Sequence, residues 1–311
     1  MISLEIISLI LLLNKMHMNQ RTLVSFDWAA KRLLRKKVNF DILEGFLSET
    51  LYEDIVVKAI IESESNKETN DDKFNQVDVF CENSKNELIF IEIQFYDQID
   101  YFHRLNYAVS KVVSEHMYEG YDYVKVKKVY SINILYFDLG RGDDYIYHGR
   151  MDFRGIYRHD ALELSPAQQK EFNKTYPSDI FPEIILFKIN KFDDIIRTSL
   201  DQWVYFLKYT ELPKAFNAKG LKQVSKKLNL NKMDTVTQNN YIDYLKNVRI
   251  SQHTIDSVRK EGEEIGIQKV KVEMILTLHE DGIPIKQIAK YTKLTEDEVR
   301  IILNEQGRIK E

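Results

Sequence analysis

Alternation of apolar and polar positions predicts a β-hairpin in the first third of the chain. Its first arm, Val77–Cys81, directs the valines to one face and Asp78 to the other. The second arm, Leu88–Phe95, places Glu92 and Gln94 on one face together with apolar side chains. The pattern therefore places acidic side chains within otherwise apolar strands.

Whether Asp78 and Glu92 meet depends on the turn between the two arms. An odd-numbered turn centred on Lys85, such as a five-residue loop over Asn83–Glu87, brings both side chains to one face, with Cβ atoms roughly 5 Å apart. An even-numbered turn places them on opposite faces. Two carboxylates this close repel each other and are costly to bury, so the arrangement predicts a cation between them. Hard oxygen ligands with room for waters suit Mg²⁺ or Mn²⁺.

Helical and strand patterns on either side of the hairpin predict an α/β fold. Two helices and a strand over Ile55–Glu62 precede the hairpin, while a helix over Gln98–Glu119 and a strand over Lys128–Phe137 follow it. The order α-β-β-β-α-β predicts a mixed sheet flanked by helices. Three later segments elaborate this core: a hairpin-like stretch over Asp144–Tyr157, an apolar run over Ile184–Ile189 and a helix over Asp193–Tyr209.

The chain changes character beyond the domain over residues 21–229, where it becomes helical, charged and less aromatic. We predict a helical linker over residues 230–267. Residues 268–311 resemble a helix-turn-helix module, with helices over Val270–His279, Ile285–Tyr291 and Thr295–Leu303.

The last of these helices opens with Glu296, Asp297 and Glu298. Three carboxylates there would repel the DNA phosphates that a DNA-reading helix meets. We therefore favour packing or self-association through the C-terminal helices, as in a homo-oligomer, over reading of a DNA sequence.

Residues 1–20 form an apolar leader. Its apolar run is too short to span a bilayer, contains Glu5, and lacks both a basic segment and a small-residue cleavage site. We therefore predict neither a signal peptide nor a membrane anchor. Met16 and Met18 favour a start codon assigned too early; a membrane-associated leader is the alternative.

Composition and charge change this picture little. The single cysteine, Cys81, excludes an internal disulfide framework and favours a cytoplasmic protein. The net charge of −4 does not indicate a nucleic-acid binder, so any contact with phosphates must come from a local patch. The basic run KRLLRKK over Lys31–Lys37 is one candidate, although we favour a solvated helix face.

Several segments are specific enough to compare with known families. They are SFDWAAKRLL, NQVDVF, ELIFIEIQ, DYFHRLNYAVSK with EGYDY, and KVYSINILYFDL. Together they resemble the Rpn family of recombination-promoting nucleases and putative transposases, within the PD-(D/E)xK nuclease superfamily. The resemblance extends from Arg21 through Phe192 and beyond, and it implies a restriction-endonuclease-like core.

This resemblance assigns roles to residues of the hairpin. Asp78 and Glu92 match the two acids of the superfamily, and Gln94 occupies the position usually held by a lysine. Asp27 matches the acidic residue that opens the first helix of the family, and Val77 replaces a proline that does no chemistry. Because Gln94 is neutral, it can hydrogen-bond a water but cannot offset developing charge.

The implied reaction is metal-assisted hydrolysis of a DNA phosphodiester. Asp78, Glu92 and the backbone carbonyl of Ile93 are expected to hold Mg²⁺, with Mn²⁺ as a substitute. Glu44 or Glu49, on the second helix, is a candidate for one further ligand.

Supporting residues are expected near this metal. Gln94 would position the attacking water, while Arg104 and Tyr107, on consecutive turns of the next helix, would contact phosphate or orient a ligand. A structural salt bridge for Arg104 and core packing for Tyr107 are the alternatives. Lys111 or Arg104 would supply the cation that Gln94 lacks.

Two classes of function remain open. The first is a Mg²⁺-dependent DNA endonuclease associated with recombination or mobile elements. The second is a catalytically attenuated DNA-binding relative, which would keep the carboxylates yet show no metal-dependent cleavage.

Overall fold

The computed structural model describes residues 22–61, 77–115 and 122–308. The chain divides into two compact units, with the boundary between Gln238 and Asn239. The apolar leader over residues 1–20 lies outside the described residues. Within the described ranges, no helix combines the length and the apolar character needed to cross a membrane.

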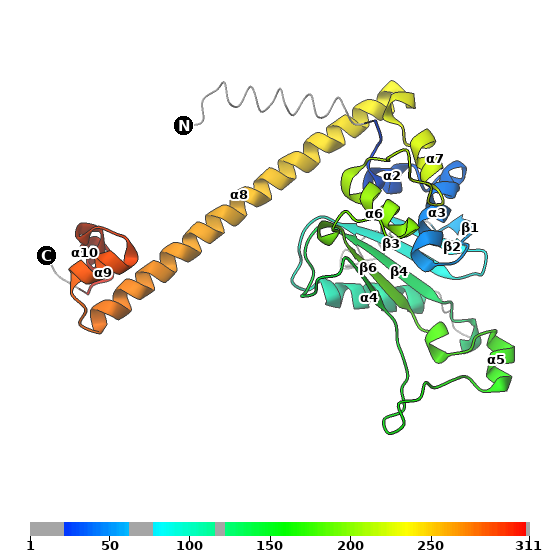
Figure 1. The fold of residues 1–311 in the computed structure, drawn as a ribbon, viewed down its shortest axis with the longest axis horizontal. Helices are drawn as coiled ribbons and strands as arrows, with labels where there is room; N and C mark the ends of the chain where they lie inside the picture. Colours follow the sequence, from blue (N-terminus) through cyan, green and yellow to red (C-terminus); the bar gives the residue numbers. More distant parts are fainter. Residues whose placement is uncertain (1–21, 62–76, 116–121, 309–311) are drawn as a thin grey trace. The chain divides into compact units, whose positions relative to one another are not determined.

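The first unit is built on one mixed six-stranded sheet (Figure 1). Its order is β1-β2-β3-β4-β6-β5, with β1, β2 and β3 antiparallel, β3, β4 and β6 parallel, and β5 antiparallel to β6. The strands are β1 (Val57–Ile60), β2 (Val79–Asn83), β3 (Leu88–Gln94), β4 (Val129–Leu135), β5 (Ile146–Gly149) and β6 (Glu183–Lys188). The predicted mixed α/β sheet is thus confirmed.

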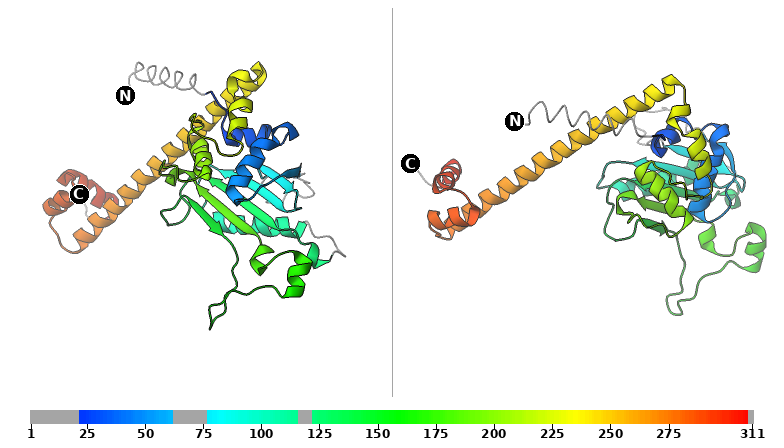
Figure 2. Two further views of the ribbon diagram at one scale, coloured as in Figure 1. Left: turned by 45° about the vertical axis from the view of Figure 1, so that its right-hand side comes forward. Right: turned by 45° about the horizontal axis from the view of Figure 1, so that its top comes forward.

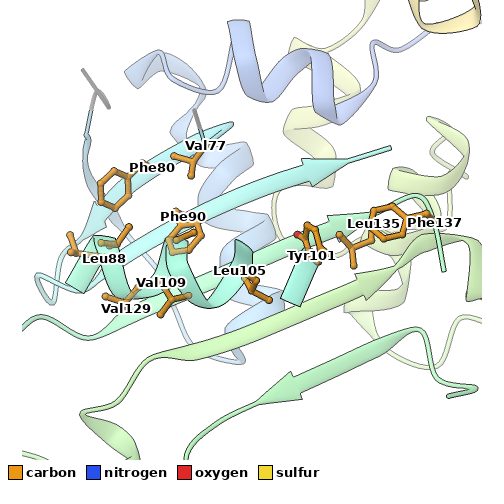
Figure 3. Close-up of a cluster of buried hydrophobic side chains, with 12 residues drawn as sticks. Val77, Phe80, Leu88, Phe90, Tyr101, Leu105, Val109, Val129, Leu135 and Phe137 are labelled. Atoms are coloured by element: carbon orange, nitrogen blue, oxygen red, sulfur yellow. The ribbon is translucent and has the colours of Figure 1, made fainter. Parts of the chain in front are cut away.

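One face of the sheet is covered by α4 (Tyr101–Glu115). Its apolar stripe packs Leu105 and Val109 against Leu88 and Phe90 of β3, within a cluster of buried residues (Figure 3). The helix begins three residues later than predicted, at Tyr101 rather than Gln98. The central strand β3 is buried on both faces from Leu88 to Ile93.

The opposite face is covered by helices from both ends of the unit, as the turned views show (Figure 2). Phe46 of α3 contacts Phe187 of β6 and Trp203 of α6, with ring centroids 5.9 and 5.4 Å away. Four helices cover this face: α2 (Phe26–Arg32), α3 (Phe40–Leu51), α6 (Ser199–Tyr209) and α7 (Leu221–Lys227).

Two predicted elements differ in the structure. The hairpin predicted over Asp144–Tyr157 is a single strand, β5, which pairs with β6. The helix predicted from Asp193 begins at Ser199, because Thr198 and Asp201 form a capping box there. Farther from the sheet lies a short helix, α5 (Pro166–Phe172).

The second unit is helical. The separate helix predicted over Val270–His279 is instead the last part of α8 (Thr235–Glu280), so no helix break marks the predicted boundary at residue 267. The helix ends before Gly282, whose φ of 76° is unfavourable for other residues. It is followed by α9 (Ile285–Thr292) and α10 (Glu296–Glu305), and the predicted capping box of Thr295 and Glu298 is confirmed.

Candidate functional site

The paired residues of the hairpin have the register that the sequence analysis required for Asp78 to face Glu92. The ladder ends where Val79 pairs with Ile91, and the Asp78 backbone N–H then donates to the Ile91 carbonyl at 3.0 Å, so the pairing becomes irregular at Asp78. The turn is shorter than the predicted five-residue loop, because the Asn83 backbone N–H donates to the Glu87 carbonyl at 3.0 Å. It remains odd-numbered and centred on Lys85, which is the condition that the sequence set.

The two strands part at Asp78. Its side-chain Oδ2 accepts the Ile93 backbone N–H at 2.7 Å, in place of a backbone carbonyl. The freed carbonyls of Val77 and Asp78 instead accept hydrogen bonds from the Arg35 guanidinium, at 3.3 and 3.0 Å. The backbone N–H and C=O of one strand residue point to the same adjacent strand, so the Ile93 carbonyl lies on the side of Asp78.

Glu92 is 4% exposed and held from two directions. Its Oε1 accepts a hydrogen bond from Gln94 Nε2 at 2.8 Å and forms an ion pair with Arg104 of α4. Arg104 also donates to Gln98 Oε1 at 2.7 Å. Arg104 is therefore bound to the hairpin. Tyr107 is half exposed, so the predicted alternative of core packing does not explain this residue.

A buried polar pair beside Glu92 was not anticipated from the sequence. Asn133 of β4 is adjacent to Glu92 in the parallel register, and Tyr101 of α4 donates its hydroxyl to Asn133 Oδ1 at 3.0 Å. Burial, followed by the charge of Glu92, raises the pKa of Tyr101. An isolated Asn within the apolar strand KVYSINILYF was the signal that could have indicated it.

Part of the basic run after Asp27 lies beside Asp78, although its basic side chains are exposed, as the prediction of a solvated helix face requires. Lys31 Nζ lies 3.2 Å from Asp78 Oδ1. Lys31, Arg32 and Arg35 line a pocket of about 480 Å³ together with Val77 and Asp78. The signal in the sequence was the four-residue spacing of Asp27 and Lys31, which directs both side chains to one side of α2.

Burial determines the electrostatics of both aspartates. It raises the pKa of Asp78, an effect that the charge of Lys31, the Ile93 N–H and Arg35 oppose. Burial likewise raises the pKa of Asp27, which a hydrogen bond from Ser25 and the charge of Lys31 oppose. Lys31 is thus the cation that both buried carboxylates share.

Three other predicted residues are held away from Asp78. Glu44 accepts the Val57 backbone N–H at 2.9 Å, at the start of β1 and the far end of β2. Glu49 accepts hydrogen bonds from the Lys219 backbone N–H, at 2.9 Å, and from Ser199 Oγ. Lys111 pairs with Glu115 at 3.5 Å, one turn along α4. These contacts give Glu44 and Glu49 structural roles in place of the predicted ligand role.

The donors around Asp78 suit a hard divalent cation. In the ranges that the structure describes, no group of three or more His, Cys, Asp and Glu side chains is placed to hold a metal. Mg²⁺, however, is commonly bound by one or two carboxylates and keeps several waters. Asp78, Glu92 and the Ile93 carbonyl supply such a set, so the residues present fit Mg²⁺ or Mn²⁺.

Comparison with known proteins gives one family. The family model described as PD-(D/E)XK nuclease family transposase matches residues 24–258. No curated protein and no solved structure gave a significant match. The matched region covers well over half of the chain and contains Asp27, Lys31, Asp78, Glu92 and Arg104, so the chain belongs to the PD-(D/E)XK nuclease family transposases.

Proposed function

We propose that this protein is a metal-dependent DNA endonuclease that hydrolyses phosphodiester bonds in recombination or in the movement of mobile elements. The observation that carries the proposal is that Asp78 and Glu92 are both buried near the end of the hairpin, where the strands part, beside a pocket lined by cations. Family membership supports a nuclease fold linked to transposition.

In this proposal, the two carboxylates act together with a backbone carbonyl as a metal site. Asp78, Glu92 and the Ile93 carbonyl would hold Mg²⁺, or Mn²⁺ as a substitute. When bound, the metal lowers the pKa of a coordinated water and neutralises charge on the phosphate. The Ile93 N–H fixes the orientation of the Asp78 carboxylate through its bond to Oδ2, which leaves Oδ1 directed at Lys31.

Gln94 and Arg104 orient the second carboxylate. Gln94 donates its amide N–H to Glu92, which leaves its side-chain carbonyl oxygen to accept a hydrogen bond from the attacking water. Arg104 compensates the charge of Glu92 in a buried setting, where an unpaired carboxylate would be costly. Asp27 supports the site through the charge of Lys31.

Plasmid cleavage tests the proposal. Purified full-length protein is incubated with supercoiled plasmid and Mg²⁺ or Mn²⁺, beside an EDTA control and the variants Asp78→Asn and Asp243→Asn. Asp243 is a matched control because its carboxylate is exposed on α8 and pairs with Lys246, three residues further along the same helix, at 2.9 Å. We expect nicking or linearisation by the wild type and by Asp243→Asn, and loss of at least about 100-fold in Asp78→Asn. Equal cleavage by Asp78→Asn would refute the site.

One observation favours the second candidate, a catalytically attenuated DNA-binding relative. The ion pair with Arg104 already neutralises Glu92, so a cation must compete for this carboxylate. In that case the folded wild type would bind DNA in a gel-shift assay yet leave the plasmid intact with either metal.

The proposal extends to partners and location. DNA would contact the first unit, because α10 of the second unit begins with three acidic residues. We assign the second unit to self-association. Cys81 is buried, which raises the pKa of its thiol to about 12 and keeps it unreactive. A buried, unpaired thiol is consistent with a cytoplasmic protein.

A further inference from the structure

We propose that Lys31, on α2, is the cationic catalytic residue that the neutral Gln94 cannot be, and that it contacts the scissile phosphate from the pocket beside Asp78. This inference rests on the proposed nuclease function and names one further residue for it. It replaces Arg104 and Lys111, the two cations that the sequence suggested.

The geometry singles out Lys31. Its Nζ lies 3.2 Å from Asp78 Oδ1, while its side chain keeps 46% of its surface exposed in the pocket. An ammonium placed in this way is fixed by one buried carboxylate and still has two donors for a ligand in the pocket. A phosphate that reaches Asp78 must therefore approach Lys31.

The two cations that the sequence suggested for this role are committed elsewhere. Arg104 pairs with Glu92 and donates to Gln98, and its side chain is 20% exposed. Lys111 pairs with Glu115 and is 14% exposed. Neither contributes to the pocket beside Asp78, which is lined by Lys31, Arg32 and Arg35.

Two neighbours support the contact between Lys31 and Asp78. Arg35 donates to the carbonyls of Val77 and Asp78, so it anchors the strand end that carries the carboxylate to the chain that follows α2. Asp27, one turn before Lys31 on α2, adds a buried negative charge that attracts the ammonium. Both are positioning residues.

The test uses full-length protein with four variants. Lys31→Met removes the charge and keeps the length of the chain, and Lys31→Arg keeps the charge. The double variant Lys31→Met with Gln94→Lys returns an ammonium to the hairpin from β3. Lys36→Met is the matched control, because Lys36 is exposed in the same basic run and does not line the pocket.

We expect Lys31→Met to lower the plasmid cleavage rate by about 100-fold. Lys31→Arg and the double variant should recover part of this loss, and Lys36→Met should cleave like the wild type. A purely structural role for Lys31 would lower the melting temperature and would not be rescued from β3.

Binding of a short DNA duplex in EDTA gives an independent readout. Loss of one phosphate contact should reduce the slope of log K against log salt by about one in Lys31→Met but not in Lys36→Met. Two results would overturn the role of Lys31. The first is cleavage by Lys31→Met at the wild-type rate; the second is a double variant that does not regain cleavage, together with an unchanged salt slope in Lys31→Met. If the wild type itself does not cleave, the proposed function fails, and the salt slope alone decides whether Lys31 contacts phosphate.

Discussion

At the scale of single residues, the site contains carboxylates whose burial costs folding free energy. Asp27 and Asp78 are 3% and 7% exposed, and burial raises the pKa of each. Lys31 reduces this cost for both, because its charge favours their ionised forms. Residues whose pKa is shifted by burial beside a specific charge partner are typical of functional sites.

Asp27 should make stability depend on pH in a defined direction. Its folded pKa lies above the ordinary value of 3.8, so between these two values the folded protein binds a proton that the unfolded chain has released. The stability that this proton provides is present below pH 3.8 and is lost as pH rises through the folded pKa. The variant Asp27→Asn cannot ionise at this position.

We therefore expect Asp27→Asn and the wild type to unfold at similar temperatures at acidic pH, and the variant to be the more stable at neutral pH. Differential scanning calorimetry in EDTA across this range measures the difference. A difference that is constant with pH, or one that favours the wild type at neutral pH, would contradict this assignment.

At the scale of elements, α3 approaches α7 through two glycines. A Cβ on Gly45 would lie 2.4 Å from Gly220 Cα and 2.5 Å from the Lys219 carbonyl oxygen, so no side chain fits there. Gly220 itself has a φ of 86°, which disfavours any other residue. The close contact holds the helix that packs Phe46 against the sheet.

Substitution at Gly45 should therefore destabilise the first unit. We expect Gly45→Ala to cost about 1–3 kcal/mol, because backbone atoms must move apart. The matched control is Gly262→Ala on α8, where a Cβ meets nothing within 4 Å and alanine gains about 1 kcal/mol of helix propensity. Thermal unfolding followed by circular dichroism checks both; equal effects of the two substitutions would refute the close-packing argument.

At the scale of the whole molecule, α8 presents an apolar stripe without a partner in the part of its own chain that the structure describes. Val258 and Ile265 are 63% and 50% exposed. Apolar residues recur every seven positions on this helix, at Val258, Ile265 and Val272 and at Val248 and Ile255. A seven-residue apolar repeat is typical of helices that supercoil around a second helix. Since every copy carries the same repeat, a second copy of this chain is the partner that we expect.

The variant Val258→Glu with Ile265→Glu should accordingly lower the molar mass of the assembly, measured by size-exclusion chromatography with light scattering. Ile250→Glu is the control, because Ile250 is 64% exposed on the same helix but lies outside the repeat. A wild type that is monomeric at high concentration, or an equal effect of Ile250→Glu, would rule out this stripe as the interface.

The sequence by itself determined the central strands and the mixed sheet, and it indicated the odd-numbered turn centred on Lys85. These features follow from side-chain alternation and the parity of a short turn, which are properties of neighbouring residues. The capping box of Thr295 and Glu298 was equally local. The unbroken α8 was not predicted, because charged and small residues conceal the seven-residue repeat there.

Only the tertiary structure decided which distant residues join the hairpin. The contact of Lys31 with Asp78, and the engagement of Glu44 with β1 and Glu49 with the start of α6, depend on how α2 and α3 pack against the sheet. A helical pattern shows which residues share a face but not where that face is placed. Packing of apolar side chains far apart in sequence fixes that placement, and it is what brought the basic run to the buried carboxylate.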